Sequence, residues 1–272
     1  MRPTPLLSLT PRRLAVKLRR YLASWWRMLH LGAVALVMAM SPSTYHRANR
    51  LAASRYIYAS SWQVLPWFTV LAALISLVII RIVLVTAQSY GLSRYALEMV
   101  VRVLVLELLP LSAAMFVALR AGLAFDANAM GLARAGVPDL DSTGAALDDA
   151  LRRLRRDLVP QVAASAFAVL SLAMASSVIV LVLAYLNVYG LSPWGLPDYT
   201  RTVGRVFSPE VTIGFVLKTV LFGMSVAVIP TAAVLDLQRY PRRLASNVQP
   251  GALRLLFVLL LIEAGSLAVK YI

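Results

Sequence analysis

The chain has 272 residues, 60% of them hydrophobic, and its mean hydropathy is +0.75. A soluble globular domain is closer to half apolar, so this composition excludes an ordinary soluble enzyme or binding domain. The formal net charge is +15. In a membrane protein such charge collects in cytoplasmic loops, and it does not indicate a nucleic-acid partner. Cysteine is absent, which excludes disulfides and thiolate metal sites.

Residues 1–60 form a basic N-terminal region with one amphipathic segment, in which apolar side chains recur at helical spacing. Its purely apolar part, 31–40, is shorter than the roughly 20 residues that a spanning helix needs. A basic face with paired tryptophans, Trp25 and Trp26, is typical of a helix lying in the headgroup layer. We therefore predict an interfacial helix anchored by these tryptophans, with a sixth span at 22–40 and a signal peptide as alternatives.

Residues 61–272 contain five stretches that are long and apolar enough to cross a bilayer. Spanning segments must pair every backbone polar group internally, which favours helices, and the short alternating segments of a β-barrel are not seen. The sequence thus predicts an all-α integral membrane protein, with the interfacial helix followed by five transmembrane helices. The predicted spans are 63–87, 96–124, 160–187, 211–235 and 252–271.

The second predicted span contains LELLPLSAAMFVALRAG at 106–122 and is longer than one straight crossing needs. Pro110 is expected to break or kink this helix. A break would let Glu107 and Arg120 face a polar interior lined by protein instead of lipid.

The loop at about 125–159 is predicted to hold a helix of its own, with Pro160 opening the next span. The apolar stripe of this helix comprises Leu147, Leu151, Leu154 and Leu158. Its basic border comprises Arg152, Arg153, Arg155 and Arg156. Such a stripe fits a docking face for a partner, and ordinary packing or adhesion to the membrane surface would also explain it.

The distribution of Lys and Arg predicts the orientation of the five spans. Residues 1–60 hold ten of them, the 125–159 loop five, and 236–251 three, whereas only three would lie on the opposite side. Cytoplasmic loops carry the excess of positive charge, so the N-terminus is predicted to be cytoplasmic and the C-terminus periplasmic. A sixth span at 22–40 would place the N-terminal cluster on the wrong side.

Charged residues within the predicted spans are candidates for function, because a charge at mid-membrane costs roughly 2.5–3.5 kcal/mol by insertion scales. Glu98 and Arg102 are four residues apart and are predicted to form a structural ion pair. Cations near span ends can extend toward the interface, and we assign no function to Arg81, Arg254 or Lys270. For the deeper residues, a functional or subunit-contact role and structural pairing are both open: Glu107, Arg120, Lys218 and Glu263.

Motifs for catalysis and metal binding are absent from the sequence. His30 and His46 are the only histidines, and neither has a carboxylate or cysteine at ligand spacing. No phosphate-binding G-x-x-x-x-G-K-[ST] loop occurs, so this chain cannot itself cradle ATP. We expect no enzyme activity, no metal and no bound cofactor in this chain.

Four short motifs resemble those of the MlaE (YrbE) family of permeases. ELLP (107–110) and ALRAG (118–122) are similar to the family's E-L-G-P and A-G-R-x-G segments, through Glu107, Pro110, Arg120 and Gly122. QSYGL (88–92) resembles its Q-G-Y segment, LKTVLFG (217–223) its K-[ST]-x-x-F segment, and LLIEAGSLAV (260–269) its closing segment, with Glu263 in place of aspartate. The resemblance runs from about residue 60 to the C-terminus.

This resemblance implies a permease subunit of an ABC transporter in a bacterial inner membrane, moving phospholipid or another hydrophobic molecule. The implied partners are a second copy of the chain, a cytoplasmic P-loop ATPase dimer that hydrolyses the ATP, and a periplasmic MCE-domain protein. The 125–159 loop would then contact the ATPase. An ion-coupled secondary transporter or membrane scaffold is the alternative, with Glu107, Lys218 and Glu263 as a proton relay.

Overall fold

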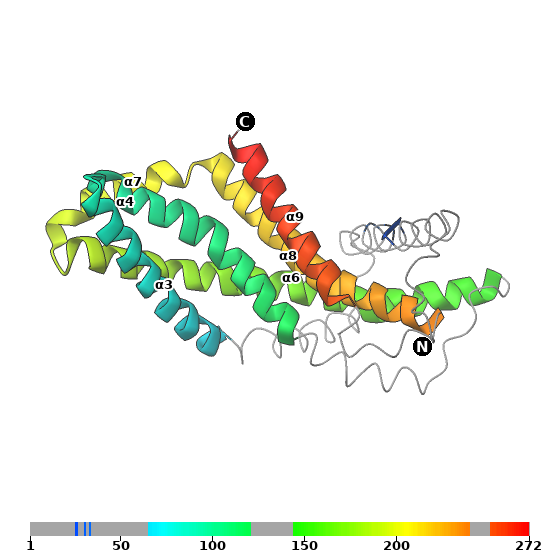
Figure 1. The fold of residues 1–272 in the computed structure, drawn as a ribbon. Helices are drawn as coiled ribbons and strands as arrows, with labels where there is room; N and C mark the ends of the chain where they lie inside the picture. Colours follow the sequence, from blue (N-terminus) through cyan, green and yellow to red (C-terminus); the bar gives the residue numbers. More distant parts are fainter. Residues whose placement is uncertain are drawn as a thin grey trace, which may run out of the picture.

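The computed structural model describes three segments of backbone, 65–120, 144–239 and 251–271, together with Trp25, Trp26, His30 and Ala33 (Figure 1). Side chains are described for most of these residues, but not for 93–94, 144–160, 231, 234–239 or 271. The calls on Gly122 and on the first part of the 125–159 loop lie outside the described residues.

The described residues form helices joined by short turns. In chain order the helices are α3 (Leu65–Ser89), α4 (Ser93–Met99), the π-helix η3 (Val100–Leu108), α6 (Gly144–Tyr189), the 3-10 turn η4 (Pro193–Gly195), α7 (Leu196–Val206), α8 (Pro209–Arg239) and α9 (Ala252–Tyr271). Five helical segments are long and apolar enough to span a membrane: Leu65–Ser89, Tyr95–Arg120, Gln161–Tyr189, Pro209–Pro230 and Ala252–Lys270. The all-α, five-span prediction is confirmed.

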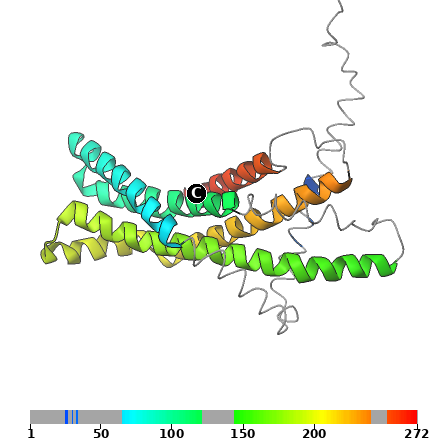
Figure 2. The same cartoon turned by 90° about the horizontal axis from the view of Figure 1, so that it is seen from below.

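Helices α6 and α8 form the central pair of the bundle and make its most extensive contact. Helix α3 packs against α6, and α9 packs against α8, so both flank the central pair (Figures 1 and 2). The core between these helices is built mainly from small and branched apolar side chains, together with Phe68, Phe215 and Phe222. Helix α9 is the least covered, since only 11% of its span is buried.

Helix α7 lies across one end of the bundle, beside α4 and the α3–α4 turn (Figure 1). Its Tyr199 hydroxyl donates a 2.8 Å hydrogen bond to the carbonyl of Leu181 on α6. Burial raises the pKa of Tyr199 to about 12, so its hydroxyl keeps its proton at any physiological pH. At this end the chain turns at Gly190, which has a positive φ of 66°, a conformation that glycine adopts readily.

The irregularity expected at Pro110 takes the form of a π-helix rather than an interruption. Residues 93–120 are helical throughout, and Val100–Leu108 follow the wider π pattern, with the Leu109 N–H bonded to the Leu104 carbonyl five residues earlier. A proline clashes with the carbonyl four residues before it and offers no N–H. Widening the preceding turns removes that conflict, so the chain crosses the bundle without turning back.

The third span begins at Gln161, close to the predicted start at 160, but the helix itself does not begin at Pro160. Helix α6 runs without a break from Gly144 to Tyr189, and Pro160 lies inside it. A proline removes one helical hydrogen bond, and at Pro160 this loss does not end the helix. The predicted separate loop helix is therefore the first part of α6.

The α6–α8 contact depends on a glycine. A Cβ built on Gly223 of α8 would lie 2.3 Å from the Ala166 Cα and 2.9 Å from the Ser165 carbonyl oxygen of α6. The hydroxyl of Ser165 also donates a 2.7 Å hydrogen bond to the Gly223 carbonyl. Small residues at helix crossings allow such close backbone approach in membranes, where association depends on packing and interhelical hydrogen bonds.

Changing Gly223 to alanine is expected to destabilise the protein, because α6 and α8 must separate to admit the methyl group. Overpacking of this kind costs about 1–3 kcal/mol. The midpoint of thermal unfolding in detergent measures the loss. Gly214→Ala is the matched control in the same helix, since nothing lies within 4 Å of a Cβ there, and it should be neutral or slightly stabilising. Equal midpoints for the two variants would contradict the close contact.

Candidate functional site: a buried charge network

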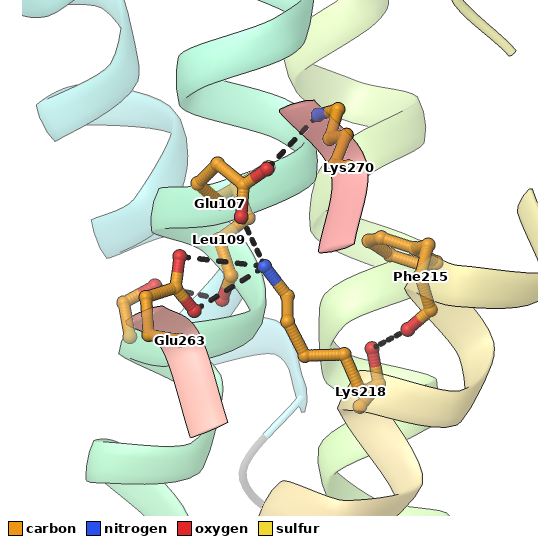
Figure 3. Close-up of polar contacts among 8 residues, drawn as sticks. Glu107, Leu109, Phe215, Lys218, Glu263 and Lys270 are labelled. Carbon is orange, nitrogen blue, oxygen red and sulfur yellow. Dashed lines mark hydrogen bonds and ion pairs between the residues drawn. The ribbon is translucent and has the colours of Figure 1, made fainter. Parts of the chain in front are cut away.

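Three helices bring four charged side chains together inside the bundle (Figure 3). Glu107 comes from η3, Lys218 from α8, and both Glu263 and Lys270 from α9. Glu107, Lys218 and Glu263 each lie near the middle of their spans, so the cluster is at membrane depth. We call these four residues the charge network.

Lys218 is the centre of the charge network. Its Nζ donates a hydrogen bond to Oε2 of Glu107 and lies 3.3 Å from Oε1 and 3.2 Å from Oε2 of Glu263. The Lys218 side chain is only 4% exposed, the lowest value in the network. Its ammonium group also lies 6.0 Å from the centre of the Phe222 ring, within the range of a cation–π contact.

Glu107 joins the two lysines. One carboxylate oxygen accepts from Lys218, and the other accepts a 3.0 Å hydrogen bond from Nζ of Lys270. Two carboxylates and two ammonium groups balance to zero net charge, which is how ions at membrane depth are tolerated. The charge network therefore ties η3, α8 and α9 to one another through ionic contacts.

The structure brings together only some of the residues that the sequence predicted as candidates for a functional site. Lys218 contacts both Glu107 and Glu263 directly. Pro110 is buried and lies less than one helical turn after Glu107. Arg120 is half-buried at the end of the same span, 13 residues after Glu107, or roughly 20 Å along the helix. Arg120 is thus too distant to contact Glu107, and its place in a polar interior stays a prediction.

Lys270 belongs to the charge network, although the sequence analysis assigned it no function. It lies near the end of α9, and long side chains at span ends usually extend toward the interface. Lys270 follows Glu263 by seven residues, which places both side chains on one face of the helix. This spacing in the sequence could have identified Lys270 as a partner in the charge network. The predicted Glu98–Arg102 ion pair is present, with 2.7 Å between Arg102 Nη2 and Glu98 Oε1.

The tryptophan pair predicted as an anchor lies beside α9. The ring of Trp25 packs edge-on against Phe257, with 5.8 Å between the ring centres and an interplanar angle of 84°. The neighbouring Trp26 is 72% exposed. Trp25 therefore contacts the bundle near the start of α9, whereas Trp26 is mostly exposed. The interfacial helix predicted around them lies largely outside the described residues.

The coupling candidates lie on the first part of α6. The backbone is helical there, and the spacings of four, three and four residues place Leu147, Leu151, Leu154 and Leu158 on one helix face. The contacts of these leucines and of Arg152, Arg153, Arg155 and Arg156 lie outside the described residues, so their role stays a prediction. Among the residues that the structure does describe, no three His, Asp or Glu side chains gather where a metal ion could be held.

Five apolar spans around a buried, charge-balanced network define a polytopic membrane protein with a polar interior, as membrane permeases have. A family model described as Permease MlaE matches residues 53–268, and the chain therefore belongs to the MlaE permease family. Membership makes it the membrane permease of an ABC transporter for lipid. The resemblance seen in the motifs is confirmed. No curated protein and no solved structure matched the chain.

Proposed function

We propose that two copies of this chain form the membrane core of an ABC transporter in a bacterial inner membrane. The core carries phospholipid or another hydrophobic molecule between that membrane and an MCE-type periplasmic protein. A separate P-loop ATPase dimer hydrolyses ATP at the cytoplasmic side, and this chain holds no cofactor. The family match across all five spans is the observation that carries the proposal.

The continuity of α6 supports coupling through the 125–159 loop. Residues 144–160 add 17 residues, or about 25 Å, to the helix before the span begins at Gln161. Beyond that point α6 packs against α3 and α8, and α8 carries Lys218. A protein that displaced the start of α6 would therefore move a rigid element in direct contact with the helix at the centre of the charge network.

Purification in mild detergent followed by a lipid-transfer assay tests the proposal. The chain should retain a P-loop ATPase in a two-to-two complex, and transfer of fluorescent phospholipid between vesicles should require hydrolysable ATP. An ion-coupled transporter would instead depend on a proton gradient and would purify without an ATPase. The proposal would be contradicted if transfer depended on a proton gradient and did not require ATP.

Changing Glu107 to glutamine is expected to reduce ATP-dependent transfer about tenfold, because two lysines lose the carboxylate that joins them across three helices. Expression should fall much less. Glu98→Gln is the matched control, since it removes a carboxylate whose only described ion-pair partner is the more exposed Arg102 on its own helix. An equal loss of expression and transfer in Glu107→Gln would indicate a purely structural role.

A further inference from the structure

Arg81 is a charged residue on the outer surface of the bundle, at membrane depth. It is exposed on α3, about four residues or 6 Å beyond the midpoint of the span toward the α3–α4 turn. The buried stripe of α3 does not include it. Within the described part of the chain, no carboxylate forms an ion pair with it.

At its depth Arg81 is stabilised by an anion. The hydrocarbon core is about 30 Å thick, so the Arg81 backbone lies roughly 9 Å inside the nearer edge of that core. Its guanidinium group can extend toward that edge, and an arginine facing lipid is stabilised when phosphate groups and water are drawn toward it. The group that meets Arg81 is therefore a phosphate drawn inward or a carboxylate on another protein.

The surroundings of Arg81 favour lipid over a neighbouring transmembrane helix. Contacts between membrane helices are enriched in small residues that let backbones approach closely. On α3 the small residues Ala72, Ser76 and Ala87 belong to the buried face. The exposed neighbours of Arg81 are bulky aliphatic residues: Leu74, Leu77, Val78, Ile82 and Val85. Such a surface suits acyl chains.

A second copy of the chain has no obvious carboxylate to offer. Within the described spans, Glu98, Glu107 and Glu263 are each ion-paired within their own chain, and Glu210 is the second residue of its span, at the edge of the membrane and not at the depth of the Arg81 backbone. Breaking one of those pairs to serve Arg81 would leave another cation without its partner.

We propose that Arg81 binds the phosphate of a phospholipid in the leaflet next to the α3–α4 turn, with the acyl chains lying over the aliphatic face of α3. This site is on the outside of the bundle, separate from the charge network. It does not depend on the transport function, since it follows from the position of one arginine.

Lipid-dependent thermal stability of the delipidated, detergent-purified protein tests the site. Dioleoyl phosphatidylglycerol should raise the unfolding midpoint, whereas dioleoylglycerol, which has the same chains and no phosphate, should raise it less. In Arg81→Leu, the phosphatidylglycerol concentration that gives half of the maximal rise in unfolding midpoint should increase about tenfold. The reason is that a charged hydrogen bond to the phosphate is lost. Arg81→Lys keeps the charge and should retain most of the response.

Arg205→Leu is the matched control, because it removes an exposed arginine of α7 that lies outside the spans. Its response to phosphatidylglycerol should equal that of the wild type. The proposal is overturned if the wild type does not distinguish the two lipids, or if Arg81→Leu responds normally. It is also overturned if inorganic phosphate alone gives the same stabilisation. A variant Arg81→Leu that no longer dimerises but still responds normally to the lipid would overturn it too.

Discussion

Replacing Lys218 with methionine is expected to cost the protein about 3–5 kcal/mol of stability, the largest loss that we expect from one substitution in the spans. Lys218 is the only described ion-pair partner of Glu263, whose side chain is 12% exposed. Without the ammonium group Glu263 would be buried as an uncompensated charge beside Glu107. The unfolding midpoint and the yield of folded protein from membranes measure the loss.

A second substitution separates the charge from the packing. In Lys218→Met with Glu263→Gln, both charges of the central pair are gone, and Glu107 still has Lys270. Most of the lost stability should return, because replacing both partners of a buried ion pair by groups of similar volume is often close to neutral. If the double variant were as unstable as Lys218→Met alone, the shape of the lysine side chain would matter more than its charge.

Changing Leu151 and Leu154 to aspartate is expected to release the ATPase while leaving the permease dimer intact. The two leucines lie at the centre of the stripe on α6, and central apolar anchors supply most of the free energy of a docking interface. Binding should weaken at least about a hundredfold. Co-purification of the ATPase and the mass of the detergent-solubilised permease are the two measurements.

A conservative pair of changes controls for damage to the helix itself. Leu151→Met with Leu154→Met keeps the apolar face and nearly the same volume, so the ATPase should stay bound. An ATPase that remained bound to the aspartate variant would show that the docking segment has been assigned to the wrong part of the chain.

The spans could be predicted from the sequence because length and hydrophobicity decide whether a helix crosses a bilayer. The Glu98–Arg102 pair could be predicted as well, since a spacing of four residues fixes the distance on a helix. The partners of Glu107 could not, because Lys218 is 111 residues away and the contact depends on how η3 and α8 are rotated in the bundle. From the sequence, only their depth within the predicted spans identified Glu107 and Lys218 as candidate functional residues.

Two proline predictions were wrong in part. At Pro110 the sequence indicated a break or a kink, and the helix does not break but widens into the π-helical stretch that carries Glu107. At Pro160 it indicated a new helix, and α6 continues through it. At Pro110 the proline removes one hydrogen bond, whereas a spanning helix that stopped there would expose several unpaired backbone groups to lipid. Within the span, the membrane environment therefore favours a distorted helix over an ended one. Pro160 lies just before the span that begins at Gln161, and there the proline removes one hydrogen bond without ending the helix.

Cysteine accessibility tests most directly the central claim that the start of α6 faces the cytoplasm, where an ATPase can reach it. The natural chain contains no cysteine, so Ala146→Cys and Thr200→Cys each introduce a single reactive thiol, at the start of α6 and on an exposed position of α7. With a membrane-impermeant maleimide, the account predicts that Thr200→Cys is labelled in right-side-out vesicles and Ala146→Cys only in inverted ones. Labelling of Ala146→Cys from the periplasmic side would contradict it.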